Sequence, residues 1–565
     1  MSVVAFLNDS SEVFKSRFEM KDVIKVFFSP FENNCSYRNY FCIKDIYDYS
    51  RYCNKLLKEI LDIRKNKNYR DWIGIVNSLL FIEIFFYFLN GKYLTKAIKN
   101  IIERTKPDYI YVSKRLPPYF VDFIREEFPH IKVKNGKGYD IIRWLFTGTL
   151  RVIIKSVLLI INRIHLISLS RSISLNKILF LIQFWRVDSE ALLPVIKRAK
   201  DKGVSFNLVT SSIGAYNRLK DEGCLPIEIE SGLSISDIIS GIVLSYILWF
   251  KTLHEFIRKT SQKGLSRTFK RLMLYCDAFR PNTIYQFIMT LYGIRGILSN
   301  LKPSTVVVAD DLHSTGRASC IIARKMGIPS ICLQNGPMSV EDYGFIPIFA
   351  DKFIAWGEEV KSSFISYGEE ASKIEVCGSP RYDELFQKID VSGKYDCEYI
   401  LYASSMYEDK ELDEDISAIK MVCKHLRVKL LISPHPAMNE DYFVKKLEDG
   451  DIQYEIERGG LVSAIKKSRL VIIGNSGAGI EAILMGKDLI IYNPGHISGI
   501  IPFAKYGSAI EVNNKDELLE KVKSLLSGNI NLEEGRKRFI CAYLSGVDGR
   551  SCDRVLEVIE GLRKR

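Results

Sequence analysis

Two short polar clusters in the C-terminal half of the sequence carry side chains that can bind a phosphate. Each cluster follows an apolar run with the composition of a buried strand. Ser433 and His435 follow one run, and Asn475 and Ser476 follow the other, Leu470–Ile473. In an open α/β sheet, ligands bind outside the carboxyl ends of the strands, so both clusters are expected to line one crevice.

The residue types in these clusters favour an anionic ligand. Gly477 relaxes the backbone where a helix is expected to begin near Ala478, and the Ser476 hydroxyl lies beside the N–H groups of that helix, which attract a phosphate. His435 can donate a hydrogen bond or a proton to an anionic oxygen. Glu481, one turn into the helix, is placed to accept hydrogen bonds from ribose hydroxyls. Two ordinary βα turns with a capping serine and an incidental histidine would give the same pattern.

Four segments, in chain order, resemble motifs of a known superfamily. They are Gln334–Gly336, Cys377–Asp383, Ser433–Pro436, and Gly474–Gly477 with Glu481 downstream. Ser-Pro-His-Pro and the serine segment are similar to the His-Pro motif and the downstream serine motif of GT-B enzymes that build bacterial and archaeal surface polymers. That group includes polysialyltransferases, capsule polysaccharide glycosyltransferases and CDP-glycerol glycerophosphotransferases. The resemblance extends from about Ser304 to Gly561.

The resemblance implies an α/β protein of the GT-B class, with two Rossmann-like lobes facing a central cleft and a nucleotide-sugar donor held mainly by the C-terminal lobe. His435 and Ser476 would support the leaving phosphate without a metal, and no cofactor is expected. Asp413-Glu414-Asp415 matches a DxD metal string, but its charged, helix-like surroundings favour a solvated face. The expected donor-binding residues are Ser433, His435, Asn475, Ser476, Gly477, Glu481, Ser379 and Arg381.

An acceptor hydroxyl must lose a proton as it attacks, so a base is expected on the N-terminal lobe. Asp310 and Asp311 stand at the carboxyl end of the strand Thr305–Ala309 and resemble the acidic pair that begins an Asp/Glu-Asp/Glu-Gly motif, with Leu312 in place of the glycine. Asp311 is the first choice of base and Asp310 the second, with His313 in reserve. Adjacent aspartates could also cap the helix that begins near Ser314.

Other motif residues leave alternatives open. Asn335 stands where the glycerophosphotransferases have a histidine base, and an amide cannot accept a proton, which favours an aspartate-based glycosyltransferase. Arg381 could pair with a donor phosphate. Arg381 and Asp383 could also pair only with their neighbours. Ser404 and Ser405, behind the strand Tyr399–Tyr402, are weaker donor-site candidates, because serines there often cap a helix.

Alternating strand and helix patterns would position these residues. In the N-terminal lobe, 1–346, the strand Lys177–Phe184, the helix Ser189–Lys202 and the strand Val204–Thr210 form a β-α-β unit. The C-terminal lobe, 347–565, has further strands separated by helical patterns, which indicates a parallel sheet covered on both faces. These strands are Lys352–Trp356, Ile374–Val376, Tyr399–Tyr402, Val428–Ile432, Leu470–Ile473 and Leu489–Tyr492.

Apolar and basic insertions distinguish the N-terminal half. Trp72–Leu89 has 18 mostly apolar residues with one charge, Glu83, which favours a core or interfacial helix over a membrane span. Arg143–Ser172 has five Lys/Arg residues and no acidic ones, with Arg151 and Lys155 opposite a broad apolar face. This is typical of an interfacial helix on an anionic leaflet, although a helix packed on its own domain fits too. We therefore expect membrane-associating helices around 72–90 and 143–172.

The bulk composition sets the remaining limits. The chain has 565 residues, of which 47% are apolar, so two or three globular domains are expected. A formal charge of +13 suits an anionic membrane or a phosphate-bearing substrate, and no nucleic-acid-binding motif accompanies it. Twelve cysteines without a C-x-x-C pair, behind an N-terminus that lacks a signal peptide pattern, favour a reducing cytoplasm.

Together these patterns predict a glycosyltransferase, peripheral on the inner face of the cell membrane. It would move a sugar from a nucleotide-sugar donor to a lipid-linked or surface-polysaccharide acceptor by metal-independent inverting displacement. Three alternatives stay open: a CDP-polyol phosphotransferase, a nucleotide-sugar 2-epimerase, and a non-catalytic scaffold in polysaccharide export.

Overall fold

The structure is a computed structural model of the 565-residue chain. It describes residues 3–7, 23–27, 102–103, 106–112, 124–125, 128–135, 141–166, 177–183, 185–262, 281–311, 313–338, 347–388, 398–404, 409–435, 438–448, 452–474, 476–494 and 501–563. The chain divides into two compact units. The first comprises Met1–Trp185, Ser205–Cys332 and Tyr343–Asp351, and the second comprises Arg186–Val204, Leu333–Asp342 and Lys352–Arg565. The predicted domain boundary at 346 and 347 stays a prediction.

A seven-stranded parallel sheet has the order β11-β10-β9-β8-β5-β6-β7. Its strands are β5 (Ile178–Ile182), β6 (Phe206–Thr210), β7 (Ile227–Glu228), β8 (Thr305–Val308), β9 (Ser330–Leu333), β10 (Lys352–Ala355) and β11 (Ile374–Val376). The chain builds outward from β5 to β7 and then returns to place β8 on the other side of β5. The topological switch point of this Rossmann-like sheet therefore lies between β5 and β8.

Two strands of this sheet were expected elsewhere. The sequence pattern placed β10 and β11 in the sheet of the C-terminal lobe. Both belong to the seven-stranded sheet, although the division into compact units groups them with the second unit. A buried parallel strand has the same apolar pattern in either sheet, because both of its faces are covered by helices. Which sheet a strand joins depends on hydrogen-bonding partners far away in the sequence.

A six-stranded parallel sheet has the order β14-β13-β12-β15-β16-β17. Its strands are β12 (Tyr399–Ala403), β13 (Lys429–Ser433), β14 (Tyr454–Ile456), β15 (Ser468–Ile473), β16 (Asp488–Tyr492) and β17 (Ile510–Val512). Its switch point lies between β12 and β15. Ala403 aligns with Ser433 on one side and with Ile473 on the other, so the loops after these three strands begin at one edge of the sheet.

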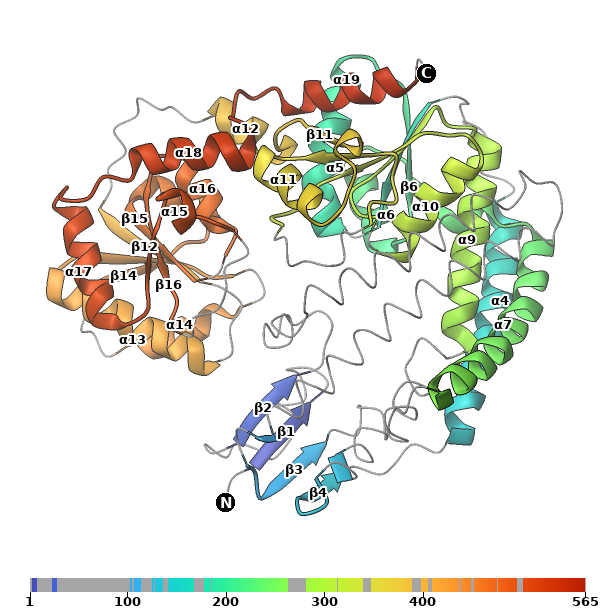
Figure 1. The fold of residues 1–565 in the computed structure, drawn as a ribbon, viewed down its shortest axis with the longest axis horizontal. Coiled ribbons are helices and arrows are strands. Elements are labelled where there is room, and N and C mark those ends of the chain that lie inside the picture. The colour runs from blue at the N-terminus through green and yellow to red at the C-terminus, as the bar shows by residue number, and fades with distance from the viewer. Residues whose placement is uncertain are drawn as a thin grey trace. The chain divides into compact units, whose positions relative to one another are not determined.

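Alternate residues of the six-stranded sheet form its core. Ile400 and Tyr402 of β12, and Ile490 and Tyr492 of β16, pack with buried side chains of α13 (Asp409–Leu426), α14 (Glu440–Leu447) and α17 (Lys515–Leu526). Figure 1 shows these helices on one face of the sheet. The opposite face is covered by α15 (Leu461–Lys467) and α16 (Ala478–Leu484). Two Rossmann-like parallel sheets confirm the predicted GT-B fold class; how the lobes face one another stays a prediction.

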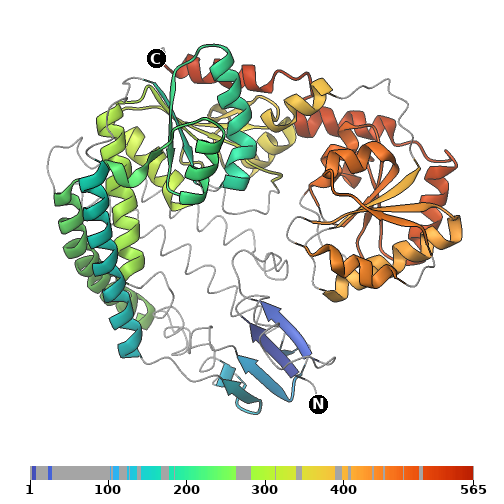
Figure 2. The ribbon, with the colours of Figure 1, turned by 180° about the vertical axis from the view of Figure 1, so that it is seen from behind.

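The described part of the first unit includes three long inserted helices. They are α4 (Ile141–Leu166), α7 (Ile235–Gln262) and α9 (Pro281–Leu301), and they pack side by side (Figures 1 and 2). Most of α9 is buried. No helix in the described ranges is both long enough and apolar enough to cross a bilayer. The run Trp72–Leu89 lies outside the described residues.

The remaining elements complete the two units. An N-terminal parallel sheet has the order β2-β1-β3-β4, with β1 (Val3–Leu7), β2 (Val23–Phe27), β3 (Tyr109–Val112) and β4 (Lys132–Asn135). The other helices are α5 (Trp185–Asp201), α6 (Ile213–Asp221), α10 (Ser314–Lys325), α11 (Glu358–Ser366), α12 (Pro380–Lys388), α18 (Glu533–Leu544) and α19 (Ser551–Arg563), with 3₁₀ turns η3 (Ile229–Gly232), η6 (Ala371–Lys373) and η7 (Ala504–Tyr506).

Candidate functional site

The loop that carries His435 is tied to the neighbouring strand by Ser404. The hydroxyl of Ser404 accepts a hydrogen bond from the backbone N–H of His435 at 2.8 Å, and the backbone N–H of Ser404 donates to the carbonyl of Ser433 at 3.1 Å. Ser404 is buried and His435 is half-buried. Ser404 therefore positions the histidine loop, a role that the sequence analysis did not assign to it. Pro436 lies outside the described residues.

The serine segment follows β15, on the other side of β12. Ser476 is half-buried, and its hydroxyl accepts a hydrogen bond from the backbone N–H of Ala478 at 3.3 Å. Gly479 permits the close approach of α16 to the sheet, because a Cβ there would lie 2.6 Å from the ring of Phe503 and 2.9 Å from Ile473. The helix expected from near Ala478 is confirmed. Asn475 lies outside the described residues.

The Gln-Asn-Gly loop lies beside this segment within the second unit. A Cβ on Gly477 would be 3.6 Å from the ring of Pro337. The side chain of Gln334 builds the loop: its Oε1 accepts from the backbone N–H of Trp356 at 2.8 Å, and its Nε2 donates to the carbonyl of Gly336 at 2.9 Å. Gln334 is buried and has a structural role, whereas Asn335 is half-buried.

Part of the Gly-Ser-Pro-Arg-Tyr-Asp segment contacts the start of α19. The Asp383 carboxylate caps α19 by accepting from the backbone N–H groups of Ser551 at 3.1 Å and Cys552 at 2.7 Å. Gly378 has a φ of +82°, and a Cβ there would lie 2.6 Å from the hydroxyl of Ser551. Asp383 therefore has a structural role in this segment, one of the two alternatives that the sequence left open.

Arg381 bridges two carboxylates. Its guanidinium donates to Glu190 of α5 at 2.5 Å and to Glu481 of α16 at 3.0 Å. Burial raises the pKa of Glu481 above its ordinary value, although the charge of Arg381 opposes this rise. The sequence analysis missed Glu190; its position one turn into the helix after β5 was the available signal.

Within the described part of the predicted donor set, two buried polar atoms have no hydrogen-bond partner. They are Oε2 of Glu481 and the hydroxyl oxygen of Ser379, and both residues are almost fully buried. Buried polar groups in proteins are nearly always satisfied, so such atoms mark places where a ligand or a water completes the structure. Glu481 offers an acceptor, and Ser379 offers both a donor and an acceptor.

Asp310 and Asp311 lie directly behind β8, at the switch point of the seven-stranded sheet. Asp311 is only 2% exposed. One of its carboxylate oxygens accepts backbone hydrogen bonds from Phe349 at 2.8 Å and Ala350 at 3.0 Å. Burial raises the pKa of Asp311 to about 6, although those hydrogen bonds act in the opposite direction. The side chain that was the first choice of base is therefore used to hold the segment before β10.

Asp310 is paired with His313 instead. Oδ2 of Asp310 is hydrogen-bonded to Nδ1 of His313, and Oδ1 accepts from the backbone N–H of His313 at 3.2 Å. The Asp310 carboxylate is buried, whereas the imidazole is 53% exposed. The close approach of α10 depends on Gly316, because a Cβ there would collide with the carbonyl oxygen of Asp310. Gln183, behind β5, also donates to that carbonyl, at 3.3 Å.

The string Asp413-Glu414-Asp415 lies in α13, where both aspartates have hydrogen-bond partners. Asp413 accepts from Tyr442 at 2.5 Å and pairs with Lys446 at 2.7 Å, and buried Asp415 accepts from Tyr402 at 2.7 Å. Over the described ranges, no group of three or more His, Cys, Asp or Glu side chains could hold a metal ion. Metal independence itself stays a prediction.

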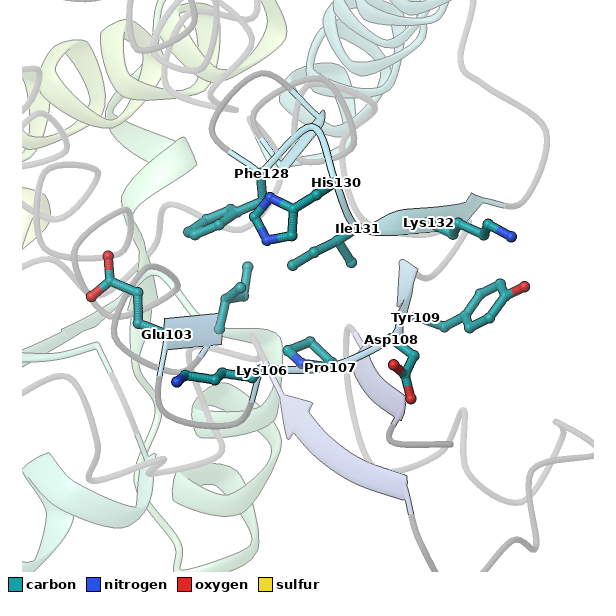
Figure 3. A pocket seen from close by; sticks show the side chains of 10 residues that line it. Glu103, Lys106, Pro107, Asp108, Tyr109, Phe128, His130, Ile131 and Lys132 are labelled. Carbon is teal, nitrogen blue, oxygen red and sulfur yellow. The ribbon is translucent and has the colours of Figure 1, made fainter.

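A cavity of about 860 Å³ opens beside the N-terminal sheet (Figure 3). Its lining includes Lys106, Tyr109, Phe128, His130 and Lys132. The Lys132 ammonium lies over the Tyr109 ring at 5.7 Å, and the rings of Phe128 and His130 meet edge to face at 6.4 Å. Among the described residues that line this cavity there is no predicted site residue.

Comparisons with known proteins bear on the fold. No protein-family model and no curated protein matches the chain. Solved structures of similar fold include S. aureus MnaA with UDP, at 17% identity, covering 68% of this chain and 96% of that one with a TM-score of 0.45. A UDP-GlcNAc 2-epimerase from Neisseria meningitidis bound to UDP-GlcNAc has 13% identity, covers 68% of this chain and 100% of its own, and has a TM-score of 0.47. A glycosyltransferase from Rickettsia africae has 14% identity, covers 69% and 99%, and has a TM-score of 0.43. These values describe a likeness in fold and carry no conclusion about activity.

Proposed function

We propose that the chain is a glycosyltransferase that moves a sugar from a nucleotide-sugar donor to a hydroxyl of a glycan or lipid-linked glycan. One observation carries the proposal: the switch point of each sheet holds side chains suited to one half of that reaction. The Asp310–His313 pair follows β8 in one sheet. The His435 loop and Ser476 lie on the two sides of β12 in the other.

The donor half rests on the second unit. His435 and Ser476 supply hydrogen-bond donors for a diphosphate or monophosphate, and the unsatisfied Oε2 of Glu481 supplies an acceptor for a sugar or ribose hydroxyl. Charge that develops on a departing phosphate is stabilised best by donors that are already held in place. The hydrogen bond from His435 to Ser404 provides such positioning for the histidine loop.

The acceptor half rests on His313, which we place ahead of Asp311 as the base. An ionised carboxylate only accepts hydrogen bonds, so Asp310 holds the proton of His313 on Nδ1 and leaves the lone pair on Nε2. The acceptor hydroxyl transfers its proton to Nε2 while its oxygen attacks the anomeric carbon. The bond from that carbon to the phosphate oxygen breaks, and the nucleotide leaves with the electron pair. Attack opposite to the leaving group inverts the anomeric configuration.

The first experiment is nucleotide binding measured by thermal shift on the purified full chain. CMP, CDP, UDP, GDP and their sugars are compared on the wild type, on His435→Ala, and on His425→Ala, which removes an exposed histidine of α13. A ligand that binds only the folded state raises the melting temperature. We expect one nucleotide to stabilise the wild type and His425→Ala but not His435→Ala. If no nucleotide or nucleotide sugar stabilises the folded wild type, the proposal fails and a scaffold role is favoured.

The products distinguish the other enzymes. A nucleotide-sugar 2-epimerase changes its substrate without any acceptor, which nuclear magnetic resonance of the sugar detects. A CDP-polyol phosphotransferase releases CMP and forms a phosphodiester. Either result would overturn glycosyl transfer while leaving the nucleotide site in place.

A further inference from the structure

One side of α4 exposes a continuous apolar stripe. Its large aliphatic side chains at positions 150, 153, 154, 157, 158 and 161 are each between 43% and 54% exposed. Steps of three and four residues place them on one face of the helix. Leaving so many aliphatic side chains in water is unfavourable, so this stripe needs an explanation.

The orientation of α4 is set from its other side. Val152 and Leu159 are buried, and the hydroxyl of Ser156 is hydrogen-bonded to that of Tyr285 in α9 at 2.7 Å. These three residues of α4 lie opposite the exposed stripe on the helix. The packing with α9 therefore directs the apolar stripe away from the interior of the unit.

The neighbouring helix α7 carries a second exposed stripe. Positions 235, 239, 243, 247 and 250 hold Ile, Ile, Val, Ile and Phe, which are between 46% and 61% exposed. Its other side is buried against α9, where Met289 contacts Gly241. Because α4 and α7 pack on each other, the structure assembles two stripes that lie more than 70 residues apart in the sequence.

The exposed charged side chains that the structure describes on these two helices are cationic. Helix α4 contains four Arg/Lys residues and no acidic residue, and Arg151 is exposed beside its stripe. On α7, Lys251 and His254 are exposed at the end of the stripe. The carboxylate of Asp237 is paired with Arg295 of α9 at 2.6 Å. Of the two acidic residues on these helices, Asp237 is thus neutralised by an ion pair, and the structure does not describe the side chain of Glu255.

We propose that the α4–α7 face, defined as the eleven exposed apolar residues above, docks this chain onto an anionic lipid surface. Aliphatic side chains would enter the acyl boundary while Arg151 and Lys251 reach phosphate head groups. A two-fold contact between copies brings the same patch of each together. It would bring Arg151 and Lys251 of one copy close to the same cations of the other. The charge pattern thus favours lipid over a second copy.

The test is sedimentation of the purified full chain with vesicles of phosphatidylcholine, with or without phosphatidylglycerol. The variant Ile154→Glu/Leu158→Glu places two carboxylates in the α4 stripe. Val243→Glu/Ile247→Glu does the same in α7. The matched control is Ile213→Glu/Leu225→Glu, which changes aliphatic side chains that are 77% and 78% exposed elsewhere in the unit. All substituted side chains are solvent-exposed, so the melting temperatures should stay close to that of the wild type.

We expect the wild type and the control to bind the anionic vesicles. Each α4 or α7 variant should bind at least tenfold more weakly. Binding should also weaken with added salt and be weaker on phosphatidylcholine alone, because cations contribute about fivefold each near an anionic surface. Equal binding by the wild type and both face variants, or none by the wild type, would overturn the proposal. If the wild type does not bind vesicles, and light scattering shows a dimer that the face variants convert to monomers, the face binds a second copy instead.

Sedimentation with vesicles measures binding and does not depend on catalytic turnover. The inference therefore stands or fails separately from the proposed glycosyl transfer. If both hold, the docking face explains how the chain would reach a lipid-linked acceptor.

Discussion

Asp310 and His313 form a hydrogen-bonded carboxylate–imidazole pair at the carboxyl end of β8, joined through both the ring nitrogen Nδ1 and the backbone N–H of the histidine. The carboxylate is buried and the ring is half-exposed. Such an arrangement fixes one tautomer and one orientation of the imidazole.

Removing either member of the pair should slow catalysis without weakening donor binding. We expect His313→Ala and Asp310→Asn to lower kcat for nucleotide release by roughly 10²–10⁴-fold, the usual contribution of a general base. The KM for the donor should stay within a few-fold of the wild type. His425→Ala controls for loss of a surface histidine. A wild-type kcat in His313→Ala would exclude the histidine as base.

The ionisation of Asp311 should make the stability of the fold depend on pH. Its pKa is raised by burial from 3.8 to about 6, so the folded state holds a proton that the unfolded state has released over that interval. Stability is therefore highest below about pH 4 with respect to this group, and is lost as pH rises through about 6, by roughly 3 kcal/mol. Asp311→Asn should flatten this part of the curve of unfolding free energy against pH.

The measurement for Asp311 is urea unfolding at several pH values between 4 and 7. A parallel shift of the whole curve, with its slope unchanged, would contradict the assigned burial effect. Nucleotide release by Asp311→Asn gives a second readout. An unchanged kcat would agree with a structural role. A folded Asp311→Asn protein whose kcat falls as far as that of His313→Ala would indicate that Asp311 is the base.

Arg381 should stabilise the fold by neutralising Glu481. Removing the partner of a buried carboxylate typically lowers the free energy of unfolding by about 3–5 kcal/mol. The loss should be smaller here because Arg381 is partly exposed. The pKa of Glu481 is already raised by burial and should rise further in Arg381→Ala. The carboxylate is then protonated at acidic pH, so the deficit should grow as pH rises. Chemical denaturation at acidic and alkaline pH would show this, and an equal deficit at both would contradict it.

Gly316 should be needed to place Asp310. A Cβ at this position would collide with the carbonyl oxygen of Asp310 and lie 2.7 Å from Nε2 of Gln183. We expect Gly316→Ala to lower stability by about 1–3 kcal/mol and to lower kcat as the aspartate shifts. Gly561→Ala, in α19 with no atom within 4 Å of its Cβ, is the matched control and should be neutral or slightly stabilising. A Gly316→Ala protein as stable and active as the wild type would contradict the packing argument.

Much of the fold followed from local patterns. Continuous apolar runs such as 470–473, and helical patterns such as 189–202, depend only on near neighbours, so their strands and helices were predicted within a few residues. The α/β class and the end of β8 as the place of the acidic pair followed in the same way. The apolar face of α4 was also predicted from its helical period. The assignment of β10 and β11 to a sheet was wrong, because strand pairing is a long-range choice.

The sequence by itself determined which residue types stand behind each strand, since strand order in the chain and polar composition are local properties. Only the tertiary structure decided which of these side chains are left for chemistry. Asp310 and Asp311 are adjacent and identical in type. Asp310 orients His313, whereas Asp311 accepts hydrogen bonds from the backbone N–H groups of Phe349 and Ala350. Hydrogen-bond partners 38 and 39 residues away made that difference. No local pattern contains such partners, because burial and pairing are settled when distant segments pack.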